Sequence, residues 1–133
     1  MPKDQLRRLQ RTRTQLLIDD TTSWQDDYEA VVLRWHTHNA AKFPPGCAGR
    51  EVNGQVLAIL DSDVAMLVMK FVNKATLSDG GASILKKHAE IIRSALPRLR
   101  GRSRSYFAEL VEIADEAVRL ASIRALNLPY LIP

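Results

Sequence analysis

The chain has 133 residues, of which 46% are hydrophobic and 26% are charged, and its formal net charge is +4. These are ordinary values for one globular domain, and six Gly and six Pro are too few for a many-turned β architecture. The lone Cys47 cannot form an intramolecular disulfide, which favours the reducing cytoplasm over secretion. We therefore expect residues 1–133 to form a single cytoplasmic domain without a signal peptide.

The N-terminal segment, residues 3–17, is predicted to form a basic helix with a sparse apolar face of leucines. Its arginines are Arg7, Arg8, Arg11 and Arg13. Residues 18–22 interrupt this pattern. Thr22 or Ser23 is expected to cap a second helix, because an amide or carboxyl side chain follows three residues later, as in a capping box. This second helix is predicted to run to about Lys42.

Residues 43–49 are a loop rich in Pro and Gly, and a long apolar helix is expected after it, from about Arg50 to Ala75. Fourteen of the 21 residues from 52 to 72 are apolar, and a helix of this length could cross a bilayer. However, Asp61, Asp63 and Lys70 lie within it, and a charge at the bilayer centre costs roughly 2.5–3.5 kcal/mol. We therefore expect the central helix of a soluble bundle.

A turn at residues 78–81 is expected to cap the next helix, which has the cleanest amphipathic stripe of the chain. Its apolar side is formed by Ile84, Leu85, His88, Ile91, Ile92, Ala95 and Leu96. Pro97 ends this helix, and a basic loop over residues 97–104 leads to a last long helix, roughly 105–126. An apolar tail follows at 127–133 and is expected to dock either on this chain or in a groove of another.

Since no segment shows strand alternation, the predicted fold is all-α: a compact bundle of four to five helices with a long central apolar helix. On a helical wheel, the central helix has an apolar arc of roughly 200°, wider than the stripe of a surface helix. Its main face comprises Val56, Leu57, Leu60, Val64, Leu67, Val68 and Phe71, and Val52, Ile59 and Met66 extend it. Asp63 and Lys70 fall within this extension.

The last helix likewise carries a second apolar line of Tyr106, Ile113 and Leu120. Both helices could simply be core helices of a monomer, but the favoured prediction is that one face of each contributes to a homodimer. The predicted oligomer or partner interface comprises Val52, Ile59, Asp63, Met66, Lys70, Tyr106, Ile113 and Leu120. If two central helices cross antiparallel near Met66, Asp63 of one copy meets Lys70 of the other and sets the register.

Arginines at alternate positions of the basic loop suggest a contact with phosphate or with an acidic partner. The candidates are Arg98, Arg100, Arg102 and Arg104, joined by Arg7, Arg8 and Arg11 of the N-terminal segment. A solvated loop is the alternative interpretation. No aromatic residues alternate with these arginines, so stacking on single-stranded nucleic acid is weakly supported, and no tight helix-turn-helix is evident.

No catalytic, cofactor-binding or metal-binding residue is predicted. His36 and His38 are two residues apart and point to different sides of a helix, as do Asp61 and Asp63. Cys47 lies in no recognisable nucleophile context.

The sequence therefore predicts a small non-enzymatic regulatory or adaptor protein, for example an antagonist of a transcription regulator. It would act on a protein partner through apolar helix faces, without membrane or metal. The alternative is a nucleic-acid-binding or nucleoprotein accessory protein that uses the arginine clusters.

Overall fold

The computed structural model describes the backbone of residues 13–127 and the side chains of residues 23–126. Four helices form a packed bundle in this part of the chain: α2 (Arg13–Ala40), α3 (Leu57–Lys74), α4 (Asp79–Ala95) and α5 (Gly101–Asn127). The mostly helical bundle predicted from the sequence is thus confirmed. None of the described helices is long and apolar enough to cross a membrane.

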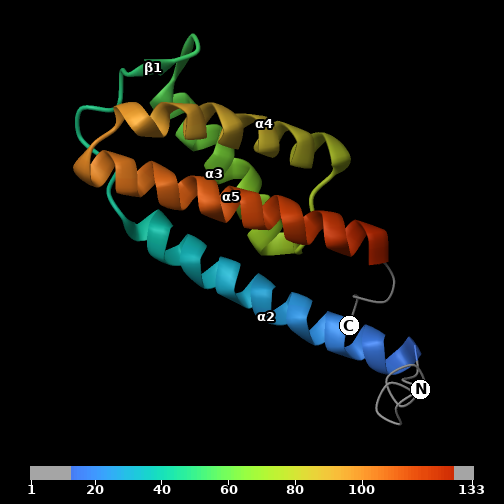
Figure 1. Cartoon of the computed structure of the whole chain (residues 1–133). Coiled ribbons are helices and arrows are strands. Elements are labelled where there is room, and N and C mark those ends of the chain that lie inside the picture. The colour runs from blue at the N-terminus through green and yellow to red at the C-terminus, as the bar shows by residue number, and fades with distance from the viewer. Residues whose placement is uncertain (1–12, 128–133) are drawn as a thin grey trace, which may run out of the picture.

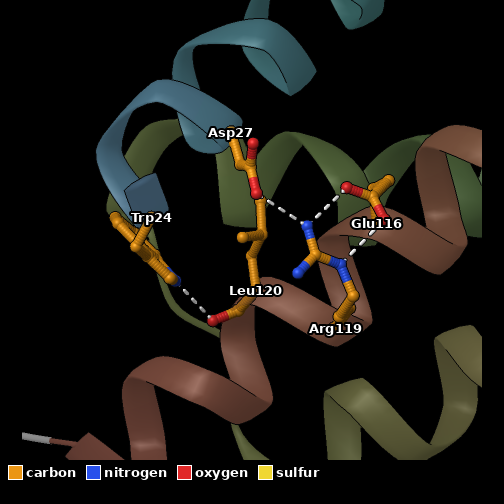
Figure 2. Close-up of polar contacts among 5 residues, drawn as sticks. All are labelled: Trp24, Asp27, Glu116, Arg119 and Leu120. Carbon is orange, nitrogen blue, oxygen red and sulfur yellow. Dashed lines mark hydrogen bonds and ion pairs between the residues drawn. The ribbon is translucent and has the colours of Figure 1, made fainter. Parts of the chain in front are cut away.

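Helix α5 lies between α2 and α4, and α3 lies behind α4 and α5 (Figure 1). A short 3-10 turn, η1 (Leu96–Arg98), joins α4 to α5 and makes the two helices antiparallel neighbours. Buried Trp24 of α2 donates its indole N–H to the carbonyl oxygen of Leu120 at 2.8 Å, while Arg119 bridges Asp27 and Glu116 (Figure 2). These contacts fix α2 along the C-terminal half of α5.

The segment before α3 is a β-hairpin and not the first turns of a helix, so the predicted helix start at Arg50 is wrong. Strands β1 (Glu51–Val52) and β2 (Gln55–Val56) pair antiparallel, with Glu51 opposite Val56. Asn53 and Gly54 connect them with φ angles of 52° and 77°. Two adjacent positive φ angles define the type I′ turn that Asn-Gly favours, and this geometry is incompatible with a right-handed helix.

Two further predicted boundaries are corrected. Helix α2 runs unbroken through residues 18–22, where a break and a cap at Thr22 or Ser23 were expected. Threonine and serine in a helix interior cost only a few tenths of a kcal/mol each, and no Gly or Pro is present to end the helix. Helix α5 begins at Gly101, so Arg102 and Arg104 of the predicted basic loop 97–104 belong to its first turns.

The turn between α3 and α4 has the predicted capping chemistry. Helix α3 ends at Lys74, and its C-cap Ala75 adopts the left-handed conformation and donates its backbone N–H to the carbonyl of Phe71 at 2.7 Å. Ser78 is the N-cap of α4, and its hydroxyl accepts the N–H of Gly81 at 3.0 Å. The predicted basic helix 3–17 up to residue 12, and the tail 128–133, lie outside the described residues.

The core follows the predicted main face of α3. Six of its members are buried: Leu57, Leu60, Val64, Leu67, Val68 and Phe71. Leu85, Ile92 and Ala95 of α4 and Phe107, Leu110 and Val111 of α5 complete the same apolar cluster. Phe71 also meets the ring of Tyr28 edge to face, and the Tyr28 hydroxyl donates to the carbonyl of Val72, so α2 and α3 are joined by both apolar and polar contacts.

Candidate functional site

The side of α3 that faces away from the core is partly apolar and open to solvent. Ile59 is 58% exposed and Met66 is 53% exposed, and Ile84 of α4, 51% exposed, lies on the same groove as Met66. Ile59, Asp63, Met66 and Lys70 follow one another at helical spacings of four, three and four residues, which places them on one stripe. We define the α3–α4 face as Ile59, Asp63, Met66, Lys70, Ile84 and His88.

A groove of about 780 Å³ runs between α3 and α4 within this face. Its apolar lining comes from Met66, Leu67, Leu77 and Ile84. The Asp63 carboxylate lies 4.0 Å from Nε2 of half-buried His88. Lys70 and Lys74 line the groove as well. Among the described residues neither lysine has a carboxylate partner. Along α3, the groove thus has the carboxylate of Asp63 on one side of Met66 and the ammonium groups of Lys70 and Lys74, which have no carboxylate partner among the described residues, on the other.

The structure separates the predicted interface residues into three groups. Ile59, Asp63, Met66 and Lys70 lie on the open α3–α4 face. Val52, Ile113 and Leu120, in contrast, are buried in this chain's own core, at 3%, 0% and 0% exposure, so they cannot line an open surface of the folded chain. Ile113 and Leu120 are buried because α5 packs against α2, α3 and α4, and these helices cover both of its apolar lines.

The remaining interface candidate, Tyr106, belongs to a polar cluster between α2, α3 and α5. Its hydroxyl donates to Oδ1 of Asp61 at 2.8 Å, and its ring centroid lies 4.3 Å from that of His38. Burial raises the pKa of Asp61 and of Tyr106, and burial lowers the pKa of His38. His38 is only 6% exposed, and its Nε2 has no hydrogen-bond partner in the described part of the chain.

A cavity of about 500 Å³ lies over this cluster, lined by His38 and Tyr106 and by Leu33, Arg34 and Glu109 among others. Arg34 binds Glu109 through two hydrogen bonds of 2.8 and 3.0 Å, and this contact lowers the pKa of Glu109. Asp61 and His38 are close enough to influence each other's charge, and no sequence pattern indicated this pairing. Their proximity depends on how α2 packs against α3, which no local sequence pattern specifies.

The structure divides the predicted arginine row. Arg98 and Arg100 line a polar pocket of about 370 Å³ together with Arg50, Cys47 and Ser103. Arg102 is directed elsewhere, because its guanidinium donates to the carbonyl of Lys42 at 2.7 Å and it lines the cavity over His38. Arg104 is exposed and lines neither pocket, whereas Arg7, Arg8 and Arg11 lie outside the described residues.

Cys47 is 3% exposed, and its thiol donates to the hydroxyl of Ser103 at 3.2 Å. Across the described residues no group of three or more His, Cys, Asp and Glu side chains is arranged to hold a metal ion. Comparisons with protein-family models, with curated proteins and with solved structures find no match to this chain. The assignment of a function therefore rests on the geometry above.

Proposed function

We propose that this chain is a small non-enzymatic regulatory or adaptor protein of the cytoplasm that acts through protein–protein contact at the α3–α4 face. The supporting observation is that Ile59, Met66 and Ile84, each more than half exposed, are placed on adjoining parts of this face. Single exposed apolar side chains are normal, but a patch rimmed by charge is typical of an interaction surface. An antagonist of a transcription regulator is one role that such a protein could fill.

The first partner of this face, in our proposal, is a second copy of the chain. An antiparallel crossing of two α3 helices near Met66 brings Asp63 of each copy opposite Lys70 of the other, and Ile59 opposite the aliphatic stem of Lys74. The surface is therefore complementary to itself in both charge and polarity, as a two-fold contact requires. Lys70, which lacks a carboxylate partner within the described residues, would acquire one at Asp63 of the other copy.

The test is the molar mass in solution from micromolar to millimolar concentration, measured by sedimentation equilibrium. Wild-type protein should be dimeric, and Met66→Glu should shift it to monomer because two like charges would meet at the symmetry axis. Leu33→Glu is the matched control, since Leu33 is 69% exposed on α2 and lines a different cavity. A wild-type chain that is monomeric throughout, or equal effects of the two variants, would contradict the proposal.

A charge exchange tests the register separately. Asp63→Lys alone should weaken association, and the double variant Asp63→Lys with Lys70→Asp should restore it, because each charge again meets its opposite. Circular dichroism spectra of both variants check that the fold is retained. If the double variant associates no better than the single one, the antiparallel register is wrong even if a dimer exists.

A further inference from the structure

The pocket at the start of α5 is lined by three arginines from two distant parts of the chain. Arg98 and Arg100 come from the connection between α4 and α5, and Arg50 comes from the segment just before β1. Arg50 is held there by a hydrogen bond of 3.0 Å from its guanidinium to the carbonyl of Arg98. Pro45, Gly46, Cys47 and Ser103 form the rest of the wall, so no carboxylate of the described residues lines this pocket.

These arginines differ from three arginines on the helix faces. Arg34, Arg93 and Arg119 each bind at least one carboxylate. In the described part of the chain, Arg98 and Arg100 have no such partner, and Arg50 contacts only a backbone carbonyl. Three like charges around one concave site repel one another, and an anion bound between them would remove that repulsion.

We propose that this pocket binds the phosphate of a small phosphomonoester. Guanidinium forks match the geometry of phosphate oxygens, and a dianionic phosphate offers enough acceptors for several of them. The first turn of α5 adds the positive end of a 27-residue helix, and the Ser103 hydroxyl is on the same wall. The volume of about 370 Å³ is that of a small-ligand site.

The same geometry favours a single phosphate group over an extended nucleic-acid backbone. Residues two apart on a helix point to different sides, so the arginines at the start of α5 cannot all face one way. Arg102 donates to the carbonyl of Lys42, whereas Arg100, just before the helix, lines the pocket. The alternating arginines therefore do not form one continuous basic track in the described structure. This site is independent of the α3–α4 face, and its test does not depend on the dimer.

The experiment is a titration of the full chain with inorganic phosphate, adenosine monophosphate and adenosine, monitored by calorimetry and by backbone amide NMR. Adenosine monophosphate should bind, inorganic phosphate should compete with it, and adenosine should not bind. The amide signals of Cys47, Arg100 and Ser103 should shift most. Arg98→Gln and Arg100→Gln should each weaken binding about tenfold, because each removes a charge-assisted hydrogen bond.

Arg104→Gln is the matched control, since Arg104 lies on the same helix start but does not line the pocket. It should change the affinity less than about twofold, as a screened, more distant charge. Equal losses for Arg104→Gln and Arg100→Gln would indicate general attraction and overturn the proposal, as would no binding of either phosphate probe at millimolar concentration. Tight binding of an oligonucleotide with or without a 5′-phosphate would also overturn it, in favour of a nucleic-acid surface.

Discussion

The two buried tryptophans of α2 provide a matched test of what holds this helix to the bundle. Trp24 and Trp35 are 4% and 2% exposed, so Trp→Phe removes a similar apolar volume at each position. The indole of Trp24 donates to the carbonyl of Leu120 at 2.8 Å, whereas that of Trp35 meets the sulfur of Met69 at 3.2 Å. A thioether is a weak acceptor, so the two substitutions differ chiefly in the hydrogen bond they remove.

The expected losses follow from these contacts. The partly refilled cavity costs about 1 kcal/mol in either variant. Trp24→Phe also removes the hydrogen bond to Leu120, whose net contribution to stability is about 1 kcal/mol. The loss is not larger, because the carbonyl of Leu120 still accepts a backbone hydrogen bond within α5 and is not left without a donor. We therefore expect Trp24→Phe to lower the free energy of unfolding by about 2 kcal/mol and Trp35→Phe by about 1 kcal/mol.

Urea unfolding followed by far-ultraviolet circular dichroism measures both values without relying on tryptophan fluorescence. One fixed protein concentration is used throughout, since association of the folded chain would add to its apparent stability. The slope with urea should be the same for all three proteins. Equal losses for the two variants, or a larger loss for Trp35→Phe, would refute the view that the Trp24–Leu120 bond fastens α2 to α5.

Three further predictions concern single residues. Ala75→Gly should raise the free energy of unfolding by about 1 kcal/mol in the same urea assay, because Ala75 has a φ of 58° that glycine adopts without strain. Burial raises the pKa of Asp61 above 3.8, so its charged carboxylate lowers the free energy of unfolding once the pH rises above the folded-state pKa, whereas the protonated carboxyl at low pH carries no such cost. Asp61→Asn should therefore be more stable than wild type at pH 7, with Tyr106 still bound to the amide oxygen, and a less stable variant would count against this. Burial lowers the pKa of His38 below 6.5, so as the pH falls its imidazole is protonated in the unfolded chain before it is protonated in the folded chain. Thermal stability should therefore fall as the pH drops below about 6.5, and the fall should be smaller in His38→Gln.

Periodicity predicted the helices best where one face meets the core continuously. The spacing of Leu57, Leu60, Val64 and Phe71 placed α3 and its buried side correctly, because burial of a helix stripe is a local property of the sequence. The same method failed from residues 51 to 56, since Val52 and Val56 fit the wheel as well as they fit a hairpin. The signal that distinguishes the two is the Asn53-Gly54 pair between them, because this dipeptide favours a type I′ turn.

The candidate sites were less predictable because they depend on contacts between distant segments. Arg50 joins Arg98 and Arg100 only because the hairpin and the start of α5 lie against the same end of α4. Likewise, Asp61 meets Tyr106 through the packing of α3 on α5, across a sequence separation of 45 residues. The sequence pattern of a helix indicates which of its sides is apolar or charged, but it does not indicate which other helix or strand packs against that side.

This distinction explains why the second apolar lines of α3 and α5 have different surroundings in the fold. Both α3 and α5 carry a second apolar line, and the sequence favoured an outside partner for each. In the fold α5 runs between α2 and α4 with α3 behind it, so Ile113 and Leu120 are covered within the chain (Figure 1). Helix α3 packs against α2, α4 and α5, but none of them covers its outer stripe, and Ile59 and Met66 stay exposed. The excess of apolar surface that the sequence signals is therefore concentrated on α3, where Asp63 and Lys70 flank Met66, and the association experiments should begin there.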